Sequence, residues 1–170
     1  MLGINIATVY AISNDKPRPL EEIYPEIGYK TVEEAIKEFE HHFKQDLKLP
    51  LRVPPVSFTH VFGRFNDVEG NDSFEMEYIN EQSSENHFMI NVRPVKDKFK
   101  IKDREVVKEY MLLNGKDATF ISISGANLLV FERDNLQYRF SVDKRISDKI
   151  TPEMLVGIAN SIDYTTEIKD

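Results

Sequence analysis

The side chains whose spacing could do chemistry are cations that recur at every second position between residues 93 and 104. They are Lys96, Lys98, Lys100, Lys102 and Arg104. Residues two apart share a face of an extended chain, so the spacing predicts a strand with one basic face. Two interpretations stay open. One is a solvated edge strand, whose lysines discourage aggregation. The other is an anion-facing strip for an acidic protein or an anionic envelope polymer.

The histidines give no metal or catalytic motif. His41 and His42 are adjacent and would lie about 100° apart on a helix, so they cannot converge on one metal. Glu34, Glu38 and His42 would share a helix face, but a metal there would need further ligands from elsewhere. We interpret this face as solvated.

An acidic loop over residues 67–72 could suggest calcium, with Asp67 at its start and Asp72 at its end. Its Gly70 is misplaced for a calcium-binding helix–loop–helix, and no glutamate follows at the required spacing. A polar hairpin turn explains the loop better. The chain has no cysteine and no glycine cluster, which excludes thiolate chemistry and a phosphate loop. The sequence thus predicts no catalytic residue, no cofactor and no metal, and hence a protein that is not an enzyme.

Composition bounds the class of protein. The 170 residues are 41% hydrophobic and 30% charged, which is ordinary for a single folded domain. The net charge of -7 argues against a general nucleic-acid binder, because neutralising phosphates needs a basic surface.

Secondary-structure signals predict two helices that flank a run of strands. Thr31–Leu47 has Thr31 as N-cap and Glu34 three residues later, which is a capping box. Thr151 caps the last helix, with Pro152 at its first position. Short connections indicate an antiparallel meander. Its expected strands are 56–66, 73–79, 87–95, 106–113, 117–124, 127–133 and 136–142, with the basic segment as an extended stretch that could lie at an edge.

The predicted fold class is therefore α+β. An antiparallel meander sheet of about six or seven strands, open or curled into a half-barrel, packs against an N-terminal and a C-terminal helix. On the second strand, residues 74, 76 and 78 are apolar and should face the core. Glu75 and Glu77 should lie on the opposite face. The alternating aromatic residues of the strands are expected to be core rather than a ligand groove.

The first residues leave two interpretations open. Residues 1–12 are apolar and uncharged, and Val9-Tyr10-Ala11 fits the small-x-small pattern of a signal-peptidase site. One interpretation assigns 1–19 to a signal or anchor remnant and linker, 20–163 to a single α+β domain and 164–170 to a tail. The other makes the first residues an element of the fold.

The C-terminal third carries a family resemblance. The motifs are Asn114-Gly115-Lys116-x-Ala118-x-Phe120, then Phe131-Glu132-Arg133-Asp134-Asn135-x-Gln137-Tyr138-x-Phe140, then Thr151-Pro152-Glu153-Met154-Leu155-x-x-Ile158-Ala159-x-Ser161-Ile162. Their succession resembles an uncharacterised bacterial family of exported or membrane-anchored domains. Such domains occur in Gram-positive lipoproteins and anti-sigma-factor-like proteins. The resemblance covers residues 30–163. Two departures are Phe131, where the family has Trp, and the basic segment.

The resemblance implies an extracytoplasmic protein, secreted or anchored at a membrane, and it carries over no catalytic residues. We therefore expect a non-enzymatic protein-interaction or sensory domain. The alternative is a carrier of a lipid-like or anionic envelope ligand in a half-barrel cavity, and the alternative location is the cytoplasm. The oligomeric state stays open.

Overall fold

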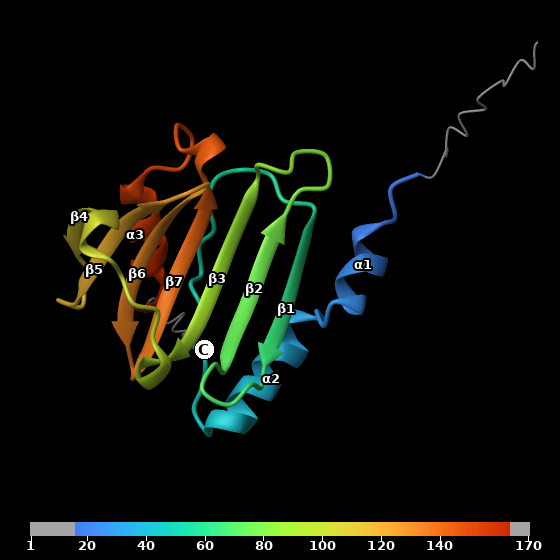
Figure 1. Cartoon of the computed structure of the whole chain (residues 1–170), viewed down its shortest axis with the longest axis horizontal. Coiled ribbons are helices and arrows are strands. Elements are labelled where there is room, and N and C mark those ends of the chain that lie inside the picture. The colour runs from blue at the N-terminus through green and yellow to red at the C-terminus, as the bar shows by residue number, and fades with distance from the viewer. Residues whose placement is uncertain (1–15, 164–170) are drawn as a thin grey trace, which may run out of the picture.

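The computed structural model describes residues 16–163, so the predictions for residues 1–15 and for the tail lie outside the described residues. Two helices precede a seven-stranded sheet and a third follows it (Figure 1). The helices are α1 (Leu20–Glu26), α2 (Val32–Phe43) and α3 (Pro152–Asn160). The strands are β1 (His60–Asn66), β2 (Ser73–Ile79), β3 (His87–Pro94), β4 (Val106–Met111), β5 (Asp117–Ile123), β6 (Ala126–Arg133) and β7 (Leu136–Asp143).

The strands lie in the order β1-β2-β3-β7-β6-β5-β4, and all neighbours are antiparallel. The predicted α+β class is confirmed. Two meanders, β1–β3 and β4–β7, join through the pairing of β3 with β7. A single continuous meander would instead pair β3 with the next strand. The sheet is not closed into a barrel, and β1 and β4 are its edges.

Helix α2 begins as the sequence predicts and ends earlier. The Thr31 hydroxyl accepts a hydrogen bond from the Glu34 amide, and the Glu34 carboxylate accepts one from the Thr31 amide. Lys44 follows the last helical residue with φ 52. This left-handed conformation stops the helix, so α2 does not reach Leu47.

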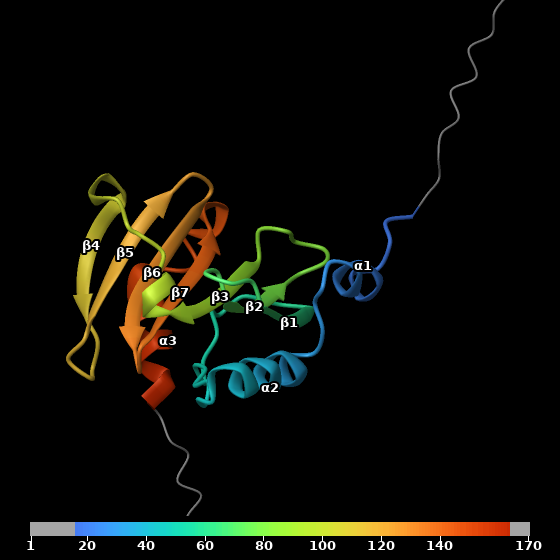
Figure 2. The same ribbon diagram turned by 60° about the horizontal axis from the view of Figure 1, so that its bottom comes forward.

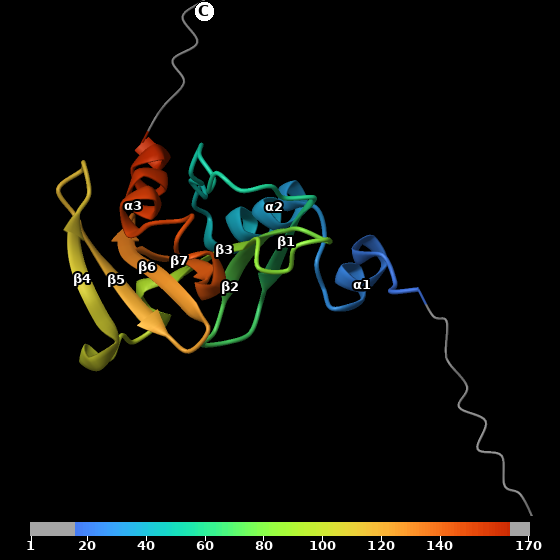
Figure 3. The ribbon, with the colours of Figure 1, turned by 90° about the horizontal axis from the view of Figure 1, so that it is seen from above.

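One face of the sheet is the apolar core, and α2 and α3 both cover it (Figures 2 and 3). We call it the core face. The cluster between sheet and helices includes Phe39, Phe74, Phe88, Ile90, Leu129, Phe131, Tyr138, Phe140, Leu155 and Ile158. Most of the predicted core aromatics are therefore confirmed. Phe131, which stands where the resembling family has Trp, is buried in this cluster. Its ring stacks on Tyr138 with 5.2 Å between ring centroids.

The opposite face, here the outer face, is crossed by a continuous row of paired residues. Cross-strand partners lie on the same face of a sheet. The register therefore aligns Arg64, Glu75, Asn91, Arg139, Val130, Thr119 and Glu109, one from each strand from β1 to β4. At the β1 end of this row the positive Arg64 lies opposite the negative Glu75.

The two edges of the sheet differ. Lys30, just before α2, forms an antiparallel bridge with Gly63 in the middle of β1, with N–H···O distances of 2.8 and 2.9 Å. Gly63 also lies so close to α2 that a Cβ there would come within 2.9 Å of the Ala35 Cβ. At the other edge β4 pairs only with β5. Its Val107 and Met111 are 60% and 72% exposed.

Candidate functional site

The basic segment is not a strand, which corrects the prediction of one extended basic face. Two single turns of 3-10 helix, Val95–Asp97 and Asp103–Glu105, flank an irregular stretch. The apolar side chains Phe99 and Ile101 explain the difference. They pack on a small cluster of Ile121, Leu128 and Val130 on the outer face of β5 and β6. Covering this apolar surface displaces the segment from an edge position.

Gln137 of β7 anchors the basic segment to the sheet through two hydrogen bonds. Its side-chain oxygen accepts a hydrogen bond from the Phe99 amide at 2.7 Å, and its nitrogen donates to the Phe99 carbonyl at 3.1 Å. The guanidinium carbon of Arg139 lies 5.1 Å from the centre of the Phe99 ring. Burial, and secondarily the charge of Arg93, lowers the pKa of Arg139. The segment is thus a fixed part of the outer face.

The five predicted basic residues divide into paired and unpaired charges. Lys98 forms an ion pair with Glu132 at 2.8 Å, and Lys102 lies 3.9 Å from the carboxylate of Glu105. Lys96 lies 4.0 Å from the carboxylate of Asp97. Within residues 16–163, no ion pair involves the two others, which are Lys100 and Arg104. The structure therefore does not gather the five charges into one strip.

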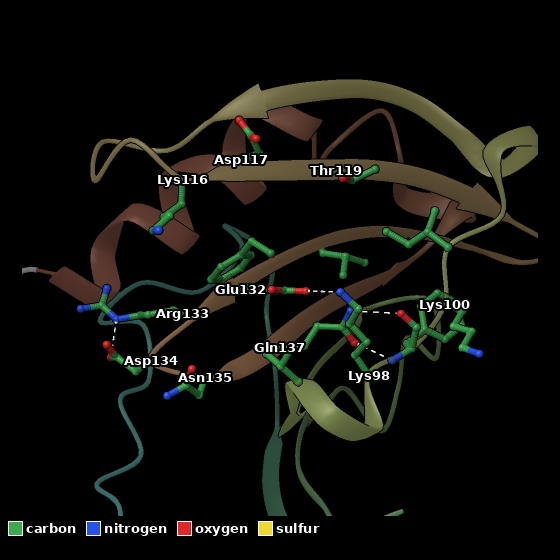
Figure 4. Close-up of a pocket in the computed structure, with 15 residues that line it drawn as sticks. Lys98, Lys100, Lys116, Asp117, Thr119, Glu132, Arg133, Asp134, Asn135 and Gln137 are labelled. Carbon is green, nitrogen blue, oxygen red and sulfur yellow. Dashed lines mark hydrogen bonds and ion pairs between the residues drawn. The ribbon is translucent and has the colours of Figure 1, made fainter.

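Two of these lysines line a groove of about 990 Å³ on the outer face (Figure 4). Lys98 and Lys100 belong to the basic segment, and Lys116 enters from the turn before β5. Val130 and Glu132 of β6 also line it. Figure 4 shows the Glu132 carboxylate facing Lys98. Lys116 makes no ion pair with any residue in 16–163. The groove therefore combines an apolar surface with two lysines that the rest of the described chain does not neutralise.

The other half of the outer face carries a carboxylate–tyrosine network that the sequence did not reveal. Glu77 of β2 accepts hydrogen bonds from the hydroxyls of Tyr29 and Tyr24, the latter at 3.1 Å. It also lies 3.3 Å from the His87 imidazole. Glu75 accepts two hydrogen bonds from Arg64, the longer at 3.1 Å. The predicted face of Glu75 and Glu77 is correct, but both are largely buried rather than solvated.

The network shifts the pKa values of its members. Burial would raise the pKa of Glu77, but hydrogen-bonding interactions with His87 and Tyr29 outweigh it and lower the pKa. Burial, with the charge of Glu77, raises the pKa of Tyr24 to about 12. Burial and a hydrogen bond to Glu77 raise the pKa of Tyr29 further. At neutral pH the Glu77 carboxylate is therefore ionised and the two phenols are neutral.

Tyr24 belongs to α1, a helix that the sequence did not predict. Its ring stacks on Phe62 of β1 with centroids 4.5 Å apart. The only available signal was the pair of tyrosines at 24 and 29 beside the apolar residues of this stretch. That pair does not indicate which strand residues the two tyrosines contact. The helix begins at Leu20.

The histidine-containing helix face is not assembled as a metal site. Glu38 pairs with Lys30 at 2.5 Å, and Glu34 serves the cap of α2. His42 turns instead toward the loop between β1 and β2, the loop considered for calcium. Its Nε2 lies 3.2 Å from Asp72 Oδ2, and its Nδ1 lies 3.9 Å from Asp67 Oδ1.

A second hollow of about 510 Å³ lies beside β1. Pro25, Tyr29, Val32, Val61 and Phe62 contribute to its lining. It is a surface cleft between the helices and an edge strand, and the core face itself is filled by the aromatic cluster. The carrier hypothesis required a cavity inside a half-barrel, whereas these two hollows both lie on the surface of the described residues. No helix in this range is long and apolar enough to span a membrane.

Comparisons with known proteins identify a family rather than an activity. Residues 61–162 match a family described as a domain of unknown function, DUF4367. The match starts in β1 and ends beyond α3, so it includes the groove and the whole outer face of the sheet. It leaves out α1 and α2. Comparisons with the curated proteins and with the solved structures found no match.

Proposed function

We propose that this chain, which belongs to the DUF4367 family, is a non-enzymatic protein-interaction domain whose groove binds an acidic, extended segment of a partner protein. One observation carries the proposal. Lys100 on one wall and Lys116 on the other are exposed lysines that flank an apolar surface and have no ion pair within residues 16–163. Charges left unpaired on both sides of a groove favour a ligand of opposite charge.

The shape of the groove favours an extended peptide. Phe99, Ile101 and Val130 supply apolar surface between the lysines. An extended peptide alternates its side chains between two directions. It can therefore set apolar side chains on this surface while its carboxylates approach the lysines. The lining carries four cations and the three carboxylates of Asp117, Glu132 and Asp134. This small positive excess is a local exception on a chain whose overall charge is -7, and it favours an acidic ligand.

The state of the carboxylates supports a binding role rather than catalysis. Acid–base catalysis by paired carboxylates needs one group that exchanges a proton near neutral pH. Glu77 has a lowered pKa and is hydrogen-bonded to two tyrosines. Glu75 is occupied by Arg64. Neither lines the groove.

The test compares two double charge reversals of the same size. The variant Lys100→Glu/Lys116→Glu changes the groove, and the variant Lys37→Glu/Lys149→Glu changes exposed lysines outside its lining. The probe is a fluorescein-labelled dodecapeptide that alternates Glu with Val and Thr, and the readout is fluorescence anisotropy. We expect the groove variant to lose affinity by on the order of tenfold or more, and the control variant by less than about threefold.

Equal losses in the two variants would overturn the proposal, as would a wild-type chain that does not bind the peptide. Competition with lipoteichoic acid separates the other ligand class. If that polymer binds more tightly than every acidic peptide tried, the groove is a site for an anionic envelope polymer and the proposal for a protein partner is wrong.

We further propose that the domain works outside the cytoplasm of a Gram-positive-type bacterium. The support is the small-x-small pattern of residues 9–11 and the resemblance to exported domains. Expression of the full chain with a C-terminal epitope, followed by protease treatment of intact cells, tests this location. Digestion of the epitope in intact cells is the expected result. Protection until the cells are lysed would place the protein in the cytoplasm.

A further inference from the structure

Three metal-ligand side chains converge outside the groove, where α2 meets the loop between β1 and β2. They are His42 from the last turn of α2 and Asp67 and Asp72 from the two ends of the loop. One ligand atom from each lies within 4.8 Å of the others. In the sequence, the helix face of His42 lacked further ligands, and the loop lacked the spacing of a calcium-binding helix–loop–helix. The fold brings them together.

Local packing positions the three residues. The His42 ring contacts Phe43 and Phe65, with centroids 4.7 and 5.1 Å away, so the imidazole is held over the β1 end of the loop. Within the loop, the Asn71 amide donates to the Val68 carbonyl at 2.7 Å and Gly70 has φ 76. This tight turn returns the chain so that both aspartates flank the same histidine.

The buried carboxylate of Asp72 is a second, independent observation. Asp72 is only 8% exposed. Its Oδ2 lies 3.2 Å from His42, whereas its Oδ1 is buried and has no hydrogen-bond partner. A buried carboxylate oxygen without a partner costs free energy, because it has given up water and gained nothing. A cation held at this position would supply the missing interaction.

We propose that His42, Asp67 and Asp72 form a binding site for a divalent transition metal, with Zn²⁺ as the preferred ion. Two carboxylates match the charge of the ion, and an imidazole nitrogen favours Zn²⁺ over Ca²⁺ and Mg²⁺, which take oxygen ligands. One ring nitrogen and one oxygen from each aspartate make three protein ligands, and water completes the shell. The bound ion ties α2 to the β1–β2 hairpin. This site is independent of the proposed function of the groove.

The test uses the untagged full chain, freed of metal by EDTA and dialysis, and titrated with ZnCl₂ in a calorimeter. His42→Gln and Asp72→Asn remove a ligand each. His41→Gln is the matched control, because His41 is an exposed neighbour on the same helix and lies outside the cluster. We expect one Zn²⁺ per chain in the wild type and in His41→Gln. In the two ligand variants the affinity should fall by at least about tenfold.

A second measurement keeps the result independent of folding. Zn²⁺ should raise the melting temperature of the wild type and of His41→Gln, and the rise should be lost in His42→Gln. His42→Gln alters a side chain that is 34% exposed, so its circular dichroism spectrum should match that of the wild type. Equal Zn²⁺ affinity in wild type and His42→Gln would overturn the proposal. Absence of Zn²⁺ binding, or tighter binding of Ca²⁺ than of Zn²⁺, would do so too.

Discussion

The outer face of the sheet has two halves that differ in how they use charge. On β1–β3, the charged groups find partners within the chain: Glu75 binds Arg64, and Glu77 is surrounded by Tyr24, Tyr29 and His87. On β5–β7, the apolar side chains of the basic segment cover part of the face. They leave a groove in which Lys100 and Lys116 have no ion pair within residues 16–163.

The comparison shows that register alone does not decide which charges are available to a ligand. Glu75 and Thr119 belong to the same cross-strand row of the same face. What differs is the segment that packs over each half. Over the first half, α1 and the turn after it bring the hydroxyls of Tyr24 and Tyr29, which donate hydrogen bonds to a carboxylate of the sheet. The basic segment brings Phe99 and Ile101, which match the apolar surface below and leave its lysines at the rim. We therefore infer that the charges of the first half serve stability, and the binding role proposed above belongs to the second half.

The largest expected effect comes from removing Glu75. Glu75→Ala leaves the half-buried Arg64 without its carboxylate, so we expect the free energy of unfolding to fall by about 2–3 kcal/mol. Urea denaturation followed by circular dichroism measures it. Glu81→Ala, at an exposed position, should change it by less than about 0.5 kcal/mol. The double variant Arg64→Met/Glu75→Leu should regain part of the loss. Equal effects of Glu75→Ala and Glu81→Ala would show that the first half is not stabilised by its charges.

A smaller effect should follow from releasing the cover of the second half. Gln137→Ala removes both hydrogen bonds to Phe99. We expect the free energy of unfolding to fall by about 1–2 kcal/mol, because two neutral hydrogen bonds are lost. The Phe99 amide should exchange with deuterium faster, and the groove should bind the acidic peptide more weakly although no lysine has changed.

Hydrogen-exchange mass spectrometry over residues 98–101 measures the release directly. Gln82→Ala, in the exposed loop before β3, is the control and should leave this exchange unchanged. If the Phe99 amide exchanges at the wild-type rate in Gln137→Ala, the segment is held by its apolar contacts alone.

The smallest effect is a difference in acid sensitivity. The folded pKa of Glu77 is lowered, so its ionised form stabilises the folded chain above the unfolded pKa of about 4.3. That contribution is lost as the pH falls from there through the folded pKa. The variant Glu77→Gln has no ionisable carboxylate at this position, so its stability does not include this contribution at any pH. Urea denaturation at pH 5, 4 and 3 should show a steeper fall in stability for the wild type than for the variant. Parallel slopes would contradict the role given to Glu77.

Local signals in the sequence predicted local structure well. The capping box of Thr31 and Glu34 gave the start of α2, and Thr151 with Pro152 gave that of α3. The end of α2 was wrong, because the left-handed conformation of Lys44 has no strong residue signature. Alternation correctly separated the two faces of β2. It failed for the basic segment, because alternating residues can also cover an apolar surface without pairing as a strand.

Interactions between distant residues could not be predicted. The pairing of β3 with β7 joins segments about fifty residues apart, and nothing within either strand specifies it. The burial of Glu77 depends on Tyr29, and the cluster at His42 depends on a loop that begins 25 residues later. Each partner was visible in the sequence, but only the fold decides which ones meet.

The backbone bridge between Lys30 and Gly63 limits how far this sheet can grow. A sheet with two free edges can add molecules at both ends and lengthen into a fibre. Here an incoming strand would collide with Lys30 at the middle of β1, so β4 is the only edge of the sheet left for pairing within residues 16–163. Two molecules that meet through β4 use up both free edges. Among the described residues, growth by strand addition through β4 would therefore stop at a pair.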